Sequence, residues 1–458
     1  MPPDEPERRP RRGLAQRLLS GAAWAFAAKL VGAGSALAIN ALLARMLSLE
    51  EFGAYFLVSS VAMFLAVVAR FGMRQTVVRL VAESVALGRP GRARAALKHV
   101  FATVAVCALI VVALYVFVLA DVLARRVFDV ALLATVTGLT AGWIALLALQ
   151  TPVAETFRGL HDIRLAVFFD GVLANAALAG MLAALWLWGT GVDFGRAVAL
   201  SVLSVALSLV LASVLFVRRA RRLRGEGDVR PAEVLRISAP LFVENLASQA
   251  MTNASLWIVG AFLLASDVAL YGAAWKLVNM IALPLMLMNM SVQPVIAELY
   301  AREEKGRLQN ALRGTATLAS IPAALVLIVF IAFGGPVLQA VFGEPYRAAA
   351  TVLAILSVGQ LANAWTGSCA LVLSFTGHQK VLMNITLATS AVSVAAIVAG
   401  TMAYGMIGAA AGVAAGRIVQ NLAGWLAVRR LTGLWTHGTV SPAFIRLAWD
   451  RVRSRRKT

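Results

Sequence analysis

The sequence is poor in acidic residues, histidine and cysteine. Its 458 residues contain 22 Asp and Glu against 42 Lys and Arg, with four His and two Cys. Cys107 and Cys369 both fall in apolar stretches, where a thiol is a small buried hydrophobe rather than half of a disulfide. The histidines lack the spacing of metal ligands. We therefore expect no metal site and no other cofactor.

Signatures of enzymes are also missing. The sequence contains no G-x-x-x-x-G-K-[ST] loop, so nothing indicates that ATP drives it. No Ser/His/Asp set or carboxylate pair indicates hydrolysis. The predicted outer loops are short, and the longest covers roughly 334–347, which leaves no room for a catalytic domain. We expect a protein that is not an enzyme.

Apolar residues dominate the composition. They make up 60% of the chain, and the mean hydropathy is +0.81. A soluble protein of this composition could not cover its apolar side chains, so we predict a polytopic membrane protein. The net charge of +20 would suit nucleic acid, but the charges lie between hydrophobic segments, where they set topology. We expect the lipid bilayer, and no nucleic acid, as a partner.

The hydrophobic pattern predicts an all-α integral membrane protein with twelve transmembrane helices. Each stretch is long enough to span a bilayer as a helix. The predicted segments are 20–44, 52–70, 97–120, 128–150, 164–188, 194–217, 237–264, 268–297, 313–333, 346–375, 380–402 and 406–428. Gly408, Gly412 and Gly416 form a small-xxx-small ladder in the last segment, which favours close helix packing.

The basic residues predict the topology. With a cytoplasmic N-terminus, 34 of the 42 Lys and Arg fall in cytoplasmic tails and loops and 5 in outer loops. This asymmetry is typical of membrane proteins and places both termini in the cytoplasm. Residues 1–19 form a predicted disordered cytoplasmic tail because they are polar and rich in Pro and Arg. Residues 431–458 form a basic cytoplasmic C-terminal tail.

The chain contains a weak internal repeat. LSLEEFGAYFLVSS, from Leu47, resembles LLASDVALYGAAWK, from Leu263, at an offset of 216 residues. We predict two six-helix bundles, 20–217 and 237–430, joined by a basic cytoplasmic linker, 218–236. Because each half has an even number of segments, the halves share one orientation. A central cavity is then expected at their interface near the membrane midplane.

A polar seam runs along the segment that opens the second half. Asn245, Gln249 and Asn253 recur every four residues, so they share one helix face, and Glu244 adjoins them. Polar groups in a membrane usually face a bundle interior or a water-filled cavity. The seam therefore favours a substrate pathway, although hydrogen bonding between helices is an alternative for each amide.

Three cations fall inside predicted segments: Lys29, Lys276 and Arg417. Each costs about 2.5–3.5 kcal/mol if it faces lipid, so each must reach water, an acid or an anionic ligand. Glu244 and Asp170 are the deep acids available to pair with them. The excess of cations favours an anionic cargo, and two or more cations around one site suit a pyrophosphate. Arg417 could instead bind a carbonyl or a helix end.

The repeat predicts a specific pair. At the 216-residue offset Lys29 falls one residue from Glu244, so we hypothesise that the two form a breakable gate pair. A static structural pair is the alternative. Lys276, Asn279 and Gln293 add a second polar stripe at helical spacing in the segment 268–297.

Several stretches resemble a known family. Leu47–Glu83, with its F-G-x-Y-x-L opening and later F-G-x(6)-R, is similar to the second-helix region of the polysaccharide-export flippases. FRGLHDIR, FTGHQK and MAYGMIGAAAGVAAGRI resemble later parts of that family. The resemblance implies two six-helix bundles in a bacterial inner membrane that alternate between inward- and outward-facing states. It also implies a polyprenyl-pyrophosphate-linked oligosaccharide as cargo. The cargo gradient and ion coupling are alternative drives for this transport, with Glu244 as a candidate proton or cation site. Polysaccharide polymerase or assembly proteins are candidate partners.

Two other functions compete with the flippase. The wider superfamily includes cation- or proton-coupled multidrug antiporters, which need acids in the cavity, and the cationic excess argues against them. The third hypothesis is a membrane partner of a glycan assembly complex that transports nothing. Intact intramembrane charges argue against this hypothesis.

Overall fold

The computed structural model describes residues 30–221, 223, 225 and 227–439, and this part of the chain contains helices and no β-strand. Eight of the described helices are long and apolar enough to cross a membrane. The predicted all-α membrane fold is therefore confirmed. The count of twelve transmembrane helices stays a prediction.

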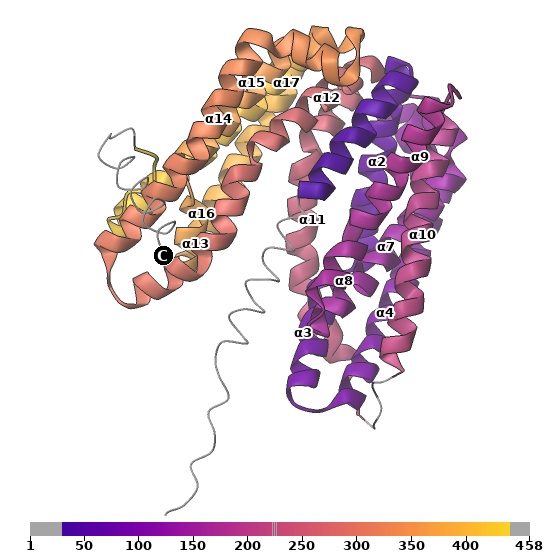
Figure 1. The fold of residues 1–458 in the computed structure, drawn as a ribbon, viewed down its shortest axis with the longest axis vertical. Coiled ribbons are helices and arrows are strands. Elements are labelled where there is room, and N and C mark those ends of the chain that lie inside the picture. The colour runs from indigo at the N-terminus through magenta and orange to yellow at the C-terminus, as the bar shows by residue number, and fades with distance from the viewer. Residues whose placement is uncertain (1–29, 222, 224, 226, 440–458) are drawn as a thin grey trace, which may run out of the picture. The chain divides into compact units, whose positions relative to one another are not determined.

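The helices follow one another with short connections (Figure 1). In chain order they are Leu30–Met46, α2 (Leu49–Arg70), α3 (Met73–Ala86), α4 (Pro90–Leu114), η1 (Tyr115–Leu119), α5 (Ala120–Val122), η2 (Leu123–Val127), α6 (Leu132–Thr135), α7 (Thr137–Gly159), α8 (Ile163–Val167), η3 (Phe168–Val172), α9 (Leu173–Leu187), α10 (Phe194–Ala220), α11 (Pro231–Phe262), α12 (Ala265–Ile281), α13 (Leu283–Ala301), α14 (Lys305–Phe342), η4 (Glu344–Ala349), α15 (Ala350–Thr366), α16 (Cys369–Phe375) and α17 (Gln379–Thr432).

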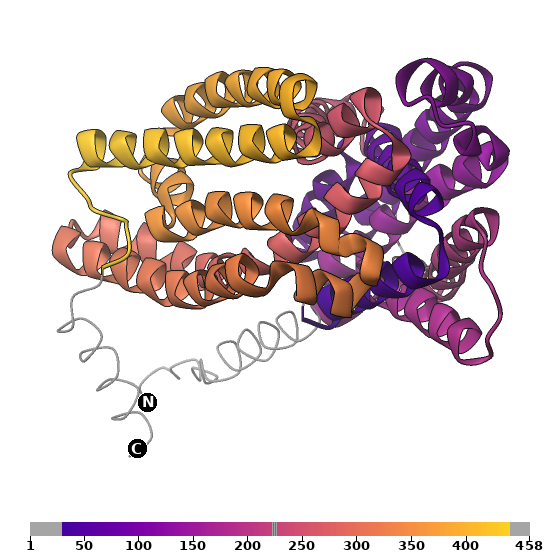
Figure 2. The same cartoon turned by 90° about the horizontal axis from the view of Figure 1, so that it is seen from above.

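Helix α17 contains the last two predicted segments as two arms. The backbone leaves helical geometry at Tyr404 and Gly405, and Figure 2 shows the arms side by side. Glycines allow this contact, because a Cβ built on Gly408 would lie 1.9 Å from the carbonyl oxygen of Gly400. A Cβ on Gly416 would meet Ser393 at 1.8 Å. The predicted packing role of the glycine ladder is therefore confirmed.

The segment predicted at 268–297 is not one helix. It divides at Ala282 into α12 and α13, and a proline occupies the first turn of α13. Proline has no backbone N–H, so it removes one hydrogen bond of a continuous helix. The predicted stripe is consequently shared between two helices, with Lys276 and Asn279 on α12 and Gln293 on α13.

The described chain forms two compact units. The first comprises the residues up to Ile39, Val61–Ala120 and Val136–Gln249, and the second comprises Asn40–Ser60, Asp121–Thr135 and the residues from Ala250 onward. In the first unit, α7 packs against α3, α4 and α10. In the second, α15 packs against α12, α14 and α17. The predicted division into bundles at 218–236 stays a prediction.

Helices α2 and α12 begin in the same way. The backbone N–H of Ser48 donates to Glu51 Oε2 at 2.9 Å, and that of Leu264 donates to Asp267 Oδ2 at 3.3 Å. An acid at this position satisfies an N–H that the first turn leaves free. Glu51 and Asp267 are separated by the 216 residues of the sequence repeat, so the shared cap supports the repeat.

A tight junction joins α2 and α3. Phe71 and Gly72 both have positive φ, at 45° and 72°, which ends α2. The ring of Phe71 stacks on that of Phe242 in α11 at 4.7 Å. A Cβ on Gly72 would lie 2.2 Å from the carbonyl oxygen of Ser238, so only glycine allows α11 to approach this closely. The F-G of the second family motif therefore fixes α11 against the α2–α3 junction.

We predict that Gly72→Ala destabilises the protein more than Gly88→Ala does. Both glycines have φ near 70°, which costs an alanine on the order of 1–3 kcal/mol at either position. Only at Gly72 does the new methyl group also meet neighbouring backbone, since nothing lies within 4 Å of a Cβ on Gly88. Thermal unfolding of the purified variants in detergent measures the difference. Equal shifts in Tm would contradict the contact.

Candidate functional site

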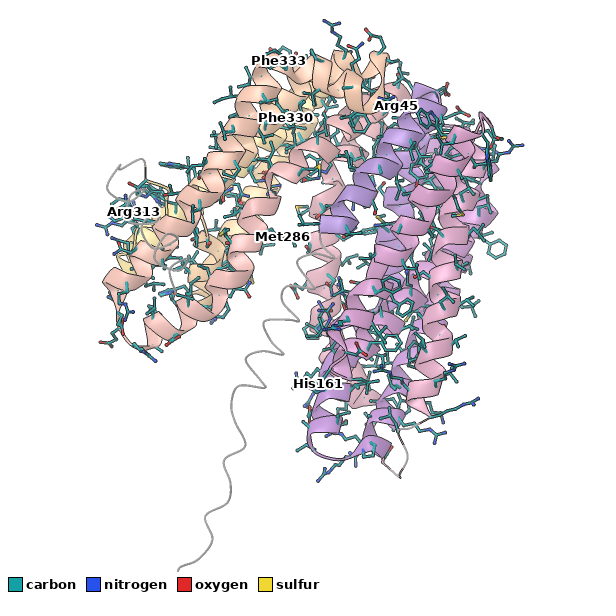
Figure 3. All side chains as sticks on the ribbon, in the orientation of Figure 1. Arg45, His161, Met286, Arg313, Phe330 and Phe333 are labelled. Atoms are coloured by element: carbon teal, nitrogen blue, oxygen red, sulfur yellow. The ribbon has the colours of Figure 1, made fainter. Side chains whose placement is uncertain are left out.

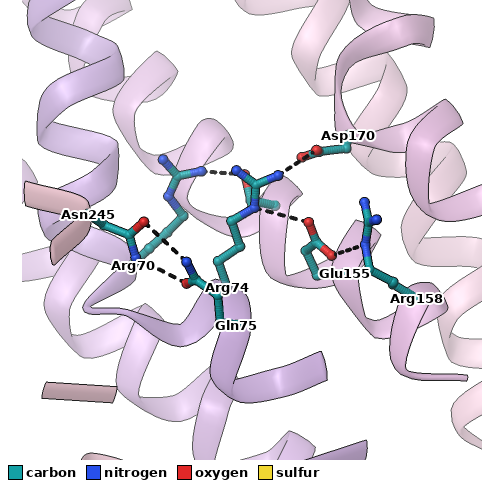
Figure 4. Close-up of polar contacts among 8 residues, drawn as sticks. Arg70, Arg74, Gln75, Glu155, Arg158, Asp170 and Asn245 are labelled. Carbon is teal, nitrogen blue, oxygen red and sulfur yellow. Dashed lines mark hydrogen bonds and ion pairs between the residues drawn. The ribbon is translucent and has the colours of Figure 1, made fainter. Parts of the chain in front are cut away.

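A charged network in the first unit is centred on Arg74 of α3, whose side chain is 46% exposed (Figure 4). Arg74 Nε lies 3.0 Å from Glu155 Oε1 on α7, and Arg74 Nη2 lies 3.0 Å from Asp170 Oδ2 in η3. The other oxygen of Glu155 binds Arg158 Nε at 2.5 Å. Glu155 is only 3% exposed, so these two arginines supply the positive charge that its burial requires.

Arg70 extends this network by one helical turn. Its Nε donates to the carbonyl oxygen of Ala66 at 3.1 Å, and its Nη1 donates to Thr151 Oγ1 at 2.5 Å. Among the residues that the structure describes, no carboxylate pairs directly with Arg70. Arg70, Arg74, Arg158, Glu155 and Asp170 together, here called the Arg74 network, therefore carry three positive and two negative charges.

A break in the helix places Asp170 within reach of Arg74. Asp170 and Gly171 leave helical geometry in η3, and Gly171 adopts φ 133°, which a residue with a side chain rarely does. Gln150 Nε2 donates to the carbonyl oxygen of Phe169 at 3.0 Å, and thus pairs backbone next to the break. Such π-helical turns are frequent at functional sites.

An amide pair lies next to the Arg74 network. Gln75 follows Arg74 on α3, and its Nε2 donates to Asn245 Oδ1 at 3.3 Å. Asn245 Nδ2 returns a hydrogen bond to Gln75 Oε1 at 3.1 Å and donates to the carbonyl oxygen of Leu241 at 2.8 Å. Asn245, a predicted site residue, therefore connects α11 to the helix that carries Arg74.

The second unit contains two cations of a different kind, Lys276 on α12 and Arg417 on α17. Both are half-buried, and neither has a carboxylate partner within the described part of the chain. Lys276 Nζ lies 5.7 Å from the centre of the Phe56 ring, which offers a weak cation–π contact. We call Lys276 and Arg417 the second-unit cations.

The other predicted site residues are placed as follows. Lys29 lies outside the described residues, so its pairing with Glu244 stays a prediction. Glu244 is exposed on α11, and Gln249 and Asn253 are half-buried on the same helix. Asn279 is exposed on α12, and Gln293 is half-buried on α13. Their role in binding a substrate stays a prediction.

Most of the Arg74 network is not evident from the sequence. The sequence predicts Asp170 as a deep acid but not Glu155, because the fourth predicted segment ends at residue 150. Helix α7 instead runs to Gly159 and carries Glu155 into the unit. Arg70 ends the second predicted segment, 52–70, and Arg74 follows it, so neither is predicted to pair with residues of another segment. Their i, i+4 spacing, matched by the i, i+3 spacing of Glu155 and Arg158, was the available signal.

These features define a multi-pass helical membrane protein that carries more cations than acids in the Arg74 network and at Lys276 and Arg417. A family model described as polysaccharide biosynthesis protein matches residues 18–300, and a model described as MatE matches residues 240–399. The chain belongs to the polysaccharide biosynthesis protein family. The resemblance found in its motifs is confirmed. No curated protein matches the chain.

Solved structures share the fold at low sequence identity. An inward-facing multidrug resistance MATE family transporter of the MOP superfamily is 16% identical with a TM-score of 0.73, over 87% of this chain and 94% of that one. The lipid II flippase MurJ, in an inward closed conformation, is 14% identical with a TM-score of 0.66, over 88% and 87%. A MOP superfamily transporter from Pyrococcus furiosus is 16% identical with a TM-score of 0.59, over 90% and 95%.

We predict that Arg74→Met lowers the free energy of unfolding by about 1–3 kcal/mol, because it removes the cation that buried Glu155 and half-buried Asp170 share, while Arg158 still binds Glu155. The double variant Arg74→Met/Glu155→Met should be destabilised by less than the sum of the two single variants. The difference is the coupling free energy, expected to be about 0.5–3 kcal/mol. Chemical unfolding in detergent measures the cycle. Arg125→Met is the control, because its pair with Asp121 is exposed and contributes at most about 1 kcal/mol. Additive effects would contradict the network.

Proposed function

We propose that the protein translocates a polyprenyl-pyrophosphate-linked oligosaccharide from the cytoplasmic to the outer leaflet by alternating access. The transported unit would serve the biosynthesis or export of a cell-surface polysaccharide. The observation that carries this proposal is the excess of cations over acids among the apolar helices, in the Arg74 network and in the second-unit cations.

The chemistry of the cations supports a pyrophosphate as the recognised group. A guanidinium presents a rigid fork of donors that matches phosphate oxygens, and an ammonium acts as a compact point charge. Lys276 and Arg417 would each cost about 2.5–3.5 kcal/mol in contact with lipid. An anionic headgroup or water that reaches them would offset this cost. The long apolar prenyl chain can stay in the bilayer while the headgroup crosses.

The comparisons support the same class of cargo. The family is described by polysaccharide biosynthesis, and MurJ is described as a flippase of lipid II. Two structural neighbours are described as inward-facing and outward-facing conformations of a multidrug resistance MATE family transporter. Because this chain shares its fold with both the inward-facing and the outward-facing conformation, the similarity supports alternating access in this protein.

We further propose that the protein is a transporter rather than an enzyme. It would lie in a bacterial inner membrane with both termini in the cytoplasm. Glu244 would hold the coupling proton or cation if the cycle is ion-coupled. Polysaccharide polymerase or assembly proteins would act on the transported lipid-linked oligosaccharide.

A coupled multidrug antiporter is the second candidate. Glu155 and Asp170 are interior acids, as such a function requires, and several structural neighbours are multidrug transporters. However, both acids already pair with Arg74, so they are not free to hold a cationic drug. The cationic excess therefore favours the flippase.

We predict that the chain restores surface glycan in a bacterial strain without its own oligosaccharide flippase, and that Lys276→Gln and Arg417→Gln lose most of this activity. Lys276→Arg should keep a large part of it, because it keeps the charge. Surface glycan is scored at matched membrane levels of each variant, with Arg125→Gln as the exposed control. Full activity of both neutral variants would remove the second-unit cations from the mechanism. Drug resistance without glycan rescue would favour the antiporter.

The gate hypothesis makes a separate prediction. Lys29→Glu and Glu244→Lys should each abolish complementation, because each places two like charges together. The exchanged double variant should recover activity, since it restores an opposite pair. The same glycan assay measures this recovery. A double variant no better than either single change would show that the residues do not pair.

A further inference from the structure

The chain turns back after α17 and crosses the ends of two helices. We call this segment, Gly433–Thr439, the C-terminal strap. Leu434 anchors it in the core of the second unit, where Leu434 is 3% exposed and packs in the same cluster as Cys369. Four polar contacts fasten the rest: Trp435 N–H to Gln309 Oε1 at 3.0 Å, Thr436 Oγ1 to the carbonyl of Thr366 at 2.9 Å, Gly438 N–H to the carbonyl of Trp365 at 2.8 Å, and Thr439 N–H to Thr317 Oγ1 at 2.9 Å.

Three tryptophan rings surround His437 of the strap. The ring centres of Trp365, Trp425 and Trp435 lie 5.3, 5.6 and 5.2 Å from that of His437. Trp425 Nε1–H donates to His437 Nδ1 at 3.2 Å. An indole nitrogen can only donate, so His437 Nδ1 must be unprotonated to accept this bond. The closed strap therefore selects neutral His437.

Two arginines, Arg313 and Arg429, add positive charge around the strap. The positive charge of Arg313 on α14 acts on His437. Arg313 lies toward the beginning of α14, whereas Phe330 and Phe333 lie toward its other end (Figure 3). The guanidinium of Arg429 stacks on the Trp435 ring at 4.2 Å and donates to the carbonyl of Gly433. Burial lowers the pKa of His437, and the charge of Arg313 lowers it further. Indole faces attract cations, but a protonated Nδ1 would direct its hydrogen at the hydrogen of Trp425 Nε1.

We propose that the C-terminal strap is a proton-responsive clasp, closed over α14, α15 and α17 while His437 is neutral and released when His437 is protonated. Protonation replaces an acceptor with a second donor opposite Trp425 and adds a charge beside Arg313. The pKa of His437 is lower in the closed strap than in a free chain, so closure is fully favoured above about pH 6.5. Closure is lost as the pH falls through the lowered value.

The clasp connects to a charged residue of the second unit. Thr436 binds the carbonyl of Thr366, and the hydroxyl of Thr366 donates to Asn421 Oδ1 at 3.3 Å. Asn421 Nδ2 donates to the carbonyl of Arg417 at 2.8 Å. Release of the strap would break the Thr436–Thr366 bond and so remove one end of this hydrogen-bonded chain to the backbone of Arg417.

Cys369 provides a native reporter of the clasp. Its thiol lies 3.1 Å from Thr436 Oγ1 and is 4% exposed, and the chain has one other cysteine, Cys107. In a Cys107→Ala protein, the rate of maleimide labelling of Cys369 is measured from pH 8 to pH 5. The matched variant His437→Asn keeps an acceptor oxygen near the position of Nδ1 but cannot become charged. Dividing the two rates at each pH cancels the titration of the thiol itself.

We expect this ratio to be close to one at pH 8 and to rise by up to about tenfold per pH unit below pH 6.5. Leu434→Ala removes the anchor and should raise labelling at every pH, which shows that the reporter responds to the strap. A ratio that stays constant while Leu434→Ala responds would overturn the proposal. The measurement needs no transport, so its failure is separate from any failure of the flippase function.

Discussion

A carboxylate buried in an apolar helix bundle needs a cation as its partner, and in the first unit this carboxylate is Glu155. Its two oxygens are taken by Arg74 and Arg158, and Arg74 in turn reaches Asp170. The three elements α3, α7 and η3 are therefore held together by charge as well as by apolar contact. Two backbone features position these charges. The junction at Gly72 sets the direction of α3, and the helix break at Gly171 brings Asp170 within reach of Arg74.

The two units use interior charge differently. In the first, two acids neutralise most of the positive charge and leave a small excess beside the Gln75–Asn245 amide pair. In the second, Lys276 and Arg417 have no carboxylate partner in the described residues. A network in which every charge has a partner makes a unit rigid, whereas a cation without an acidic partner can bind an anion or water. This contrast is the physical basis for proposing an anionic, lipid-linked cargo.

Close backbone contacts recur where helices meet. Gly408 meets Gly400 across the fold of α17, and Gly72 meets Ser238. The strap uses another solution, in which backbone amides and hydroxyls bind the ends of neighbouring helices. In the strap, buried polar backbone is paired within the protein. His437 makes one of these closures dependent on protonation.

The amino-acid sequence alone predicts the membrane class, the helical content and the family. These follow from long apolar runs and local motifs, which depend on residues close together in the chain. It also identified Asn245, Lys276 and Arg417 as unusual, because polar residues are conspicuous in apolar segments. The pairing of Arg74 with Glu155 and Asp170, which are 81 and 96 residues away, is visible only in the folded chain. Such pairing depends on helix ends and breaks, and hydropathy locates these too loosely to show which charges lie inside the unit.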